Sequence, residues 1–279
     1  MANWAQLFES FRPKVYERRR PLILINGLAE QAESWFRNRK FWTRYFDVHT
    51  PNVLVYDGEI LHEKITRKEP ISVDYLVEQF HHYITRYVQT GPVHLVSSSL
   101  GGKVAIELAV RYPHLIDRLV LICPSGMGDE EKLPIMDGVK GDTYSLIRSV
   151  FHKPKFVDRD MLKFYKAQMQ NRKWKTGLLR AVRGTLDYTV REKLKDVNQL
   201  ALMVTGQYDR ICDPTTARAA AQELRNGHFL EIAKCGHAPQ IEKHGLINRL
   251  VVRFLTSPNP ATTPGLARLF LANHRKVAP

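Results

Sequence analysis

The chain has 279 residues, of which 44% are hydrophobic and 25% are charged, a composition typical of a soluble globular protein with a sizeable core. The 42 basic and 28 acidic residues give a net charge of +14 at pH 7, but the basic residues are spread along the chain and form no nucleic-acid motif. No apolar run is long enough to predict a transmembrane helix. The charge therefore predicts a solvated basic surface and no nucleic-acid partner, with weak attraction to an anionic membrane surface as the alternative.

The cellular compartment and the metal content are predicted from absent patterns. The first residues lack the basic-then-apolar pattern of a signal peptide. The three cysteines, Cys123, Cys212 and Cys235, are too few for a disulfide framework and favour buried, reduced thiols. No CxxC or HExxH spacing indicates a metal site. We therefore expect a cytoplasmic protein without a metal or cofactor.

Short β-rich runs alternate with longer helical patterns through the first part of the chain, an order typical of βαβ units. Apolar residues recur at three- and four-residue spacing over 72–91, which predicts a helix that ends at Gly91. A second helical pattern covers 101–113. The predicted strands are 21–27, a less clear run within 46–58, 92–97 and 117–126.

The strand signal disappears between about residues 126 and 195. Helical, aromatic and basic segments replace it over 142–153, 158–171 and 174–188. The alternation then resumes, with strands predicted over 200–206 and 228–236 and helices over 215–227 and 245–255. A mostly parallel sheet that is interrupted once by helices predicts an α/β core with an inserted helical cap.

The chain therefore divides into a core, a cap and a C-terminal segment. The terminal segment combines a proline-rich linker with a short helix containing Leu266, Leu269 and Phe270, which we expect to dock on its own domain. The predicted boundaries are 1–125 and 197–257 for the two parts of the core, 126–196 for the cap, and 258–279 for the linker and short helix.

Three serines and two glycines lie where the strand at 92–97 meets the next helix. A nucleophile on a sharp strand-to-helix turn needs small neighbours two residues before and two residues after it. Ser99 has Ser97 at the first of these places and Gly101 at the second, followed by Gly102. This S-x-S-x-G-G pattern is a variant of G-x-S-x-G, so Ser99 is the candidate nucleophile.

A serine hydroxyl needs a base, and the base needs an acid that orients it. Asp209 and His237 each come directly after a predicted strand. Catalytic groups of open α/β sheets gather at the carboxyl ends of their strands, so these residues are the candidate acid and base. Asp213 is the alternative acid, although its position is typical of a turn or helix N-cap. His94 lies inside a buried strand, which favours a core role.

Together, "LILINGLAEQAESW", "LVSSSLGGKVAIELAVRYP", "VTGQYDRICDP" and "GHAPQIE" resemble the α/β-hydrolase superfamily over roughly residues 21 to 256. The resemblance implies the α/β-hydrolase fold. It also implies that Ser99 is the nucleophile, that His237 is the general base and acid, and that Asp209 orients the imidazole.

The same resemblance implies an oxyanion hole made by the backbone N–H groups of Leu28 and Leu100. Asn26 and Gly27 stand where the family usually has His-Gly, and Ser97 replaces the first glycine of the family's nucleophile turn. We expect Gly27 to preserve the oxyanion turn and the small Ser97 to fit. About twenty residues precede the first clear strand, so we expect the family's N-terminal hairpin to be shortened.

The cap is expected to determine substrate choice, because insertions over a rigid sheet carry specificity. Its aromatic side chains are candidates for an apolar pocket, with packing of the cap itself as the alternative: Tyr144, Phe151, Phe164, Tyr165 and Trp174. Arg180 and Arg183 are candidates for pairing with a substrate carboxylate, with a solvated face as the alternative.

These features predict a serine hydrolase that cleaves a small carboxylic ester or thioester with an apolar part through an acyl-enzyme. The cap sequence also resembles that of carbon–carbon bond hydrolases acting on ring-cleavage products, which are vinylogous ketones. Those enzymes usually carry Asn before the nucleophile, where this chain has Ser98. The C–C hydrolase is therefore the second enzymatic hypothesis.

Two further alternatives remain open from sequence. One is a ligand receptor or interaction protein built on the hydrolase fold, and the other is a peripheral lipid-binding enzyme. The sequence carries no signal that sets the oligomeric state.

Overall fold

The computed structural model describes residues 19–30, 32–88, 91–128, 142–260, 262–263 and 265–266. Within these residues, no helix combines the length and the apolar character needed to cross a membrane.

Six strands form one sheet in the order β2-β1-β3-β4-β5-β6, and every neighbouring pair is parallel. The predicted parallel sheet is therefore confirmed. The chain passes from β1 outward to β2 and then returns to the other side of β1 to form β3, so the direction of winding reverses between β1 and β3. The strands are β1 Pro21–Ile25, β2 Asp47–His49, β3 Val93–Ser98, β4 Ile116–Ile122, β5 Leu200–Gly206 and β6 Gly227–Ile232.

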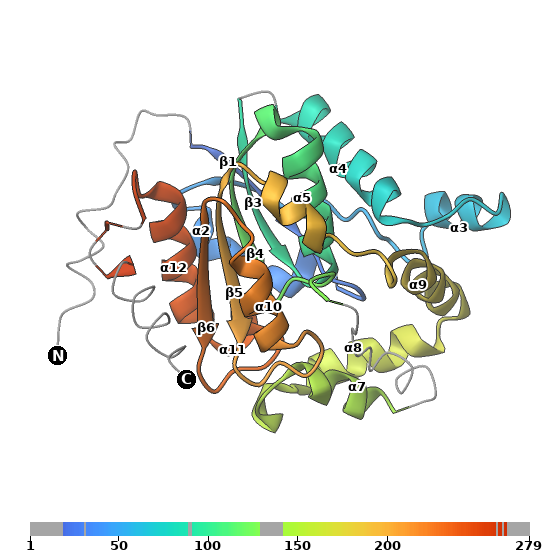
Figure 1. Cartoon of the computed structure of the whole chain (residues 1–279). Coiled ribbons are helices and arrows are strands. Elements are labelled where there is room, and N and C mark those ends of the chain that lie inside the picture. The colour runs from blue at the N-terminus through green and yellow to red at the C-terminus, as the bar shows by residue number, and fades with distance from the viewer. Residues whose placement is uncertain are drawn as a thin grey trace.

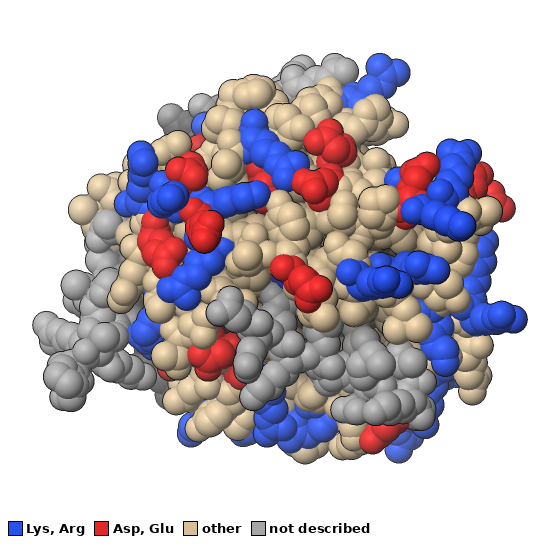
Figure 2. Space-filling model, turned by 45° about the vertical axis from the view of Figure 1, so that its right-hand side comes forward, with Lys and Arg blue, Asp and Glu red and all other residues tan. Residues whose placement is uncertain are grey.

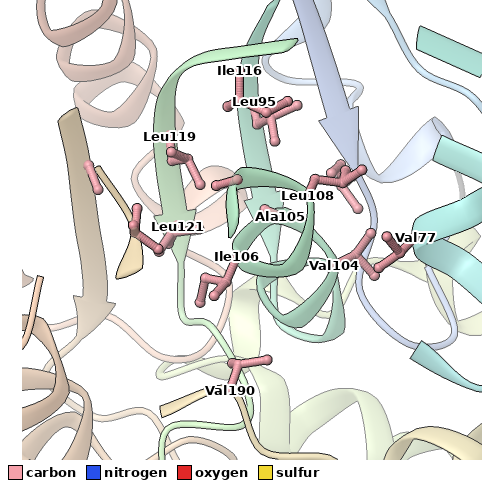
Figure 3. Close-up of a cluster of buried hydrophobic side chains, with 14 of the residues drawn as sticks. Val77, Leu95, Val104, Ala105, Ile106, Leu108, Ile116, Leu119, Leu121 and Val190 are labelled. Atoms are coloured by element: carbon pink, nitrogen blue, oxygen red, sulfur yellow. The ribbon is translucent and has the colours of Figure 1, made fainter. Parts of the chain in front are cut away.

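Strands β1, β3 and β5 are buried almost throughout because both faces of the sheet are covered there. Successive side chains point to opposite faces, so Leu95 belongs to one buried cluster and Val96 to the other. The first cluster packs the sheet against α4, α5 and α10, and the second packs it against α2 and α12. Figure 3 shows part of the first cluster, in which Val104 of α5 lies beside Val77 of α4, while Leu119 and Leu121 of β4 lie on the opposite side of α5.

The helices that cover the sheet follow the expected apolar periodicity, and Ser72 caps α4 by accepting a hydrogen bond from the Tyr75 amide. The covering α-helices are α2 Arg39–Trp42, α4 Val73–Tyr87, α5 Leu100–Arg111, α10 Pro214–Ala221 and α12 His244–Thr256. The short α11, Pro239–Glu242, precedes α12. Short 3-10 turns lie at Ala32–Trp35 (η1), Pro113–Leu115 (η2), Pro154–Phe156 (η3) and Arg191–Asp196 (η4).

The described residues between β4 and β5 contain helices and no strand, and we call residues 142–196 the helical insertion. Its helices are α7 Thr143–Val150, α8 Arg159–Gln170 and α9 Arg172–Thr185. Figure 1 shows α7 and α8 beyond the carboxyl ends of the strands. The buried Lys103 of α5 ties the insertion to the core, because its Nζ donates to the carbonyl oxygens of Thr185 (2.9 Å) and Leu186 (3.0 Å).

The structure differs from the predictions made from sequence at several segments. The predicted run within 46–58 forms only the three-residue β2, and a loop follows it. Helix α3, Glu59–Thr66, was not predicted, because its one buried residue, Leu61, packs in a cluster with residues that are distant in sequence, including those of α9. At the C-terminal end, Leu266 is buried in the second cluster, whereas Leu269 and Phe270 lie outside the described residues. The predicted shortening of the N-terminal hairpin also falls largely outside them.

Candidate active site

The reversal of winding between β1 and β3 marks the place where open α/β sheets bind ligands, just beyond the carboxyl ends of the strands. Four segments meet there. We call them the oxyanion turn (26–30, after β1), the elbow (97–102, after β3), the acid loop (207–213, after β5) and the histidine loop (233–238, after β6).

The elbow holds Ser99 in a strained backbone conformation, with φ of 50° and ψ of −118°. Surrounding bonds enforce it: the Ser99 amide donates to the Ile122 carbonyl (3.0 Å), and the Ser99 carbonyl accepts from the Ser125 amide (3.1 Å). A Cβ added to Gly101 would lie 2.4 Å from the carbonyl oxygen of Ile25. The small residues therefore let helix α5 start close against the neighbouring strands, and the Ser99 side chain faces a cavity.

Asp209 and His237 are joined by hydrogen bonds. The His237 Nδ1 lies 2.8 Å and 3.0 Å from the two carboxylate oxygens of Asp209. The amides of Ile211 and Cys212 also donate to Asp209 Oδ1, at 2.9 Å and 3.0 Å. Burial alone raises the pKa of the Asp209 carboxyl, but the adjacent His237 and these donors hold that pKa below its usual range. The carboxylate is therefore ionised, and it orients the imidazole with Nδ1 as the donor.

The alternative acid, Asp213, has a different task. It caps α10 by accepting a hydrogen bond from the Thr216 amide at 2.8 Å. His94 is buried beside Phe46, inside the sheet and away from the cavity lining.

A thiol lies next to the Asp209–His237 pair, and the ligand atoms of Cys123, Asp209 and His237 are all within 4.8 Å of one another. Burial raises the pKa of the Cys123 thiol far above its ordinary value, which disfavours the thiolate that a metal requires. These residues fit a hydrogen-bonded pair beside a small buried side chain better than they fit a metal site. The other two cysteines are also buried and unbridged.

The oxyanion turn is held by side chains that sequence reasoning did not identify. The Gly27 amide donates to Glu30 Oε2 at 2.9 Å. The Ala29 amide donates to the Tyr56 hydroxyl at 2.9 Å, and the Ala29 carbonyl accepts from the Tyr165 hydroxyl at 3.0 Å. Between these two occupied amides, Leu28 N–H has no acceptor among the described residues. Leu100 N–H lies in the first turn of α5, where amides have no partner within the helix.

Glu30 is the least expected residue of the site, because its carboxylate enters the cavity beside the elbow. Ser98 donates to Glu30 Oε1 over a long 3.4 Å, and Gln240 Nε2 donates to the Ser98 hydroxyl at 3.2 Å. Burial raises the pKa of Glu30, an effect that its bond from Gly27 and the nearby His237 only partly offset. No motif identifies Glu30, since its role depends on the turn folding back on itself.

Ser99 and His237 line one cavity of about 730 Å³ between the core and the helical insertion. Most of its described lining is apolar, as in other small-molecule sites. Phe36 and Phe164 are among the lining residues and are also exposed, so they form an apolar rim. The other apolar lining side chains are Leu28, Ala29, Leu146, Ile147, Val150, Phe151, Met161, Tyr165, Ile211, Ala238 and Ile241.

The predicted pocket residues divide into two groups. Phe151, Phe164 and Tyr165 line the cavity, whereas Tyr144, Trp174, Arg180 and Arg183 are not in its described lining. Trp174 packs against Tyr56 within the insertion's own contact with the core, and the two arginines lie on exposed faces of α9. The alternatives predicted from sequence, packing for Trp174 and a solvated face for the two arginines, therefore apply, and Tyr144 of α7 is exposed.

The cavity differs in charge from the molecule as a whole. Its described lining contains four carboxylates, Glu30, Glu33, Asp158 and Asp160, and neither Lys nor Arg. Asp158 also caps α8 through the Met161 amide, at 2.7 Å. A ligand that carries a negative charge would therefore meet like charges and no described cation.

Known proteins are similar to this chain in sequence and in fold. The human monoacylglycerol lipase ABHD6 is 21% identical over 259 residues, which cover 85% of this chain and 75% of that protein. The 2-hydroxy-6-oxo-6-phenylhexa-2,4-dienoate hydrolase of Comamonas testosteroni is 25% identical over 182 residues, 58% of this chain and 62% of that one. The solved meta-cleavage product hydrolase CumD of Pseudomonas fluorescens IP01 superposes with a TM-score of 0.73 and 20% identity, and covers 86% of this chain and 92% of its own.

Residues 22–250 match the model of the alpha/beta hydrolase family, which spans the sheet, the elbow, the insertion and the histidine loop. The predicted family and fold are thus confirmed, and the chain belongs to the alpha/beta hydrolase family.

Proposed function

We propose that this protein is a serine hydrolase that cleaves neutral carboxylic esters or thioesters with an apolar acyl or alcohol part. The observation that carries the proposal is the hydrogen-bonded Asp209–His237 pair in one cavity with Ser99, which stands on a strained strand-to-helix turn.

In the proposed reaction, His237 Nε2 takes the proton of the Ser99 hydroxyl while the oxygen attacks the substrate carbonyl carbon. Asp209 stabilises the imidazolium that forms. The amides of Leu28 and Leu100 donate to the oxyanion of the tetrahedral intermediate, and each such donor is worth about 10²–10³ in rate.

The protonated imidazole then gives its proton to the departing alcohol or thiol, and the acyl group remains on Ser99. Water, deprotonated by His237, attacks this acyl-enzyme; the bond between Ser99 Oγ and the acyl carbon then breaks as His237 returns the proton to Ser99, and the acid leaves. Tyr56 and Tyr165 hold the Ala29 peptide, and thereby keep the preceding Leu28 amide in place during both steps.

The neutral character of the substrate is proposed from the lining. A ring-cleavage dienoate, the substrate in the name of the Comamonas testosteroni relative, carries a carboxylate at neutral pH. The described lining offers no Lys or Arg to pair with that carboxylate and instead contains carboxylates of its own. An ester with an apolar chain fits the remaining side chains, so we favour ester over C–C hydrolysis.

The test is a matched pair of substrates: a p-nitrophenyl ester of succinic acid with its second carboxyl free, and the same compound with that carboxyl methylated. We expect kcat/KM to be about tenfold or more higher for the methylated compound, a factor that corresponds to about 1.4 kcal/mol of charge repulsion. Both rates should vanish in Ser99→Ala, while Ser97→Ala, which shortens a buried side chain two residues before Ser99, should retain most activity.

A preference for the free carboxylate would overturn the neutral-substrate proposal and favour the C–C hydrolase over the esterase. One slow turnover of every ester, with tight binding, would instead favour a receptor built on this fold.

A further inference from the structure

Residues 150–152, at the C-terminal end of α7 in the helical insertion, pack directly against the histidine loop. The His237 amide donates to the Val150 carbonyl at 2.8 Å. A Cβ added to Gly236 would lie 2.7 Å from both the Val150 carbonyl oxygen and the His152 amide nitrogen. Only glycine therefore allows the two segments to approach this closely at position 236.

The buried carboxylate of Glu242 forms hydrogen bonds with both segments. Glu242 Oε1 accepts a hydrogen bond from the Gly236 amide at 2.7 Å and another from the His152 amide at 3.1 Å. Glu242 is only 7% exposed, and it belongs to the α11 turn that follows His237. One oxygen atom thus joins the insertion to the residue that immediately precedes His237.

The acid loop is held in the same assembly. The His152 ring stacks on the Tyr208 ring, with centroids 4.4 Å apart and planes 12° from parallel. Tyr208 directly precedes Asp209, and its amide donates to the Cys235 carbonyl at 2.8 Å. Residues 150–152 therefore contact both loops that carry the Asp209–His237 pair.

We propose that Glu242 is a positioning residue that joins the helical insertion to the histidine loop and so fixes the His237 imidazole relative to Asp209 and Ser99. This role rests on the proposed function of His237. It follows that the insertion is not free to move away from the histidine loop at residues 150–152.

The test compares Glu242→Met with Glu242→Gln, two side chains of similar size of which only glutamine accepts hydrogen bonds. A misplacement of about 1 Å at a reacting group can cost about 10²-fold in rate. For Glu242→Met we expect kcat to fall by about 10- to 100-fold while KM changes by less than about 3-fold, and for Glu242→Gln we expect kcat within about 3-fold of the wild type.

A proton NMR readout separates this proposal from the proposed function. The downfield signal of the His237 Nδ1–H bonded to Asp209, identified by its loss in Asp209→Ala, should persist in the Gln variant and broaden or disappear in the Met variant. If the wild type hydrolyses no ester but the signal still depends on Glu242 in this way, the positioning role stands and the esterase proposal fails. If Glu242→Met keeps both the signal and kcat, the positioning role is overturned.

Two further variants serve as a control and as an alternative test. Glu223→Met removes a carboxylate that pairs with Arg191 on the surface, and it should leave kcat unchanged. If Glu242→Met does not fold, Gly236→Ala separates the same two segments by a steric clash, without removing the carboxylate. It should lower kcat with little change in KM, and an unchanged kcat in that variant would contradict the proposal.

Discussion

At the scale of the residue, the site combines groups that the sequence identifies with groups that only the fold brings in. Ser99, Asp209 and His237 could be predicted because each follows a strand, and parallel strands bring their carboxyl ends to one edge. Glu30 and Tyr56 could not, because their bonds to the oxyanion turn depend on how loops fold over the sheet.

Glu30 also makes stability depend on pH. Burial raises its folded-state pKa above the ordinary value of 4.5, so between these two values the folded protein binds more protons than the unfolded chain. This contribution to stability is complete below about pH 4.5 and is lost as pH rises through the folded pKa.

We therefore expect Glu30→Gln, which cannot ionise, to gain stability relative to the wild type as pH rises. Thermal unfolding of both proteins at pH 4 and pH 8 measures this. The difference in Tm, variant minus wild type, should be more positive at pH 8 than at pH 4, because only the wild-type carboxyl loses its proton over this range. A difference that does not change with pH would show that Glu30 titrates normally in the folded protein.

At the scale of the element, close backbone approach at the elbow links the fold to the site. Helix α5 begins close against the end of β1, and Gly101 at its start permits this contact. The strands and the long helices could be read from the sequence because their apolar patterns extend over many residues. Helix α3 could not, because its one buried side chain packs in a cluster with residues that are distant in sequence, including those of α9.

Gly101→Ala tests this close approach. The new Cβ would lie 2.4 Å from the Ile25 carbonyl and 2.8 Å from the Asn26 carbonyl, so the backbone must shift. We expect the free energy of unfolding in urea to fall by about 1–3 kcal/mol, the usual cost of overpacking.

Gly245→Ala is the matched control, because its Cβ would meet its nearest atom at 3.7 Å. That helix substitution should leave stability unchanged or raise it by up to about 1 kcal/mol. Equal effects of the two substitutions would mean that the elbow tolerates a side chain at position 101.

At the scale of the whole molecule, the chain carries a large excess of positive charge, whereas the described lining of the cavity carries carboxylates. The net charge is +14, and Figure 2 shows Lys and Arg side chains spread over one face with Asp and Glu among them. Such a surface attracts anionic membranes through long-range charge, whereas the exposed Phe36 and Phe164 at the cavity rim offer only a small apolar contact.

We expect weak binding to phosphatidylglycerol vesicles at about 10 mM salt, where the Debye length is about 30 Å, and loss of that binding at about 1 M salt, where it is about 3 Å. Phosphatidylcholine vesicles are the neutral control in a sedimentation assay, and they should bind little protein at either salt concentration. Binding to both lipids that survives 1 M salt would indicate apolar insertion at the rim rather than attraction by charge.

The central claim is that Ser99 carries the acyl group during turnover, and the most direct measurement is mass spectrometry of the acid-quenched enzyme. Wild type and Ser99→Ala would each be mixed with a p-nitrophenyl ester, quenched within milliseconds to seconds and digested. We predict the acyl group on the peptide that contains Ser99, formed together with a burst of p-nitrophenol, and neither signal in Ser99→Ala. Hydrolysis by wild type with acylation at another residue, or undiminished hydrolysis by Ser99→Ala, would contradict the account.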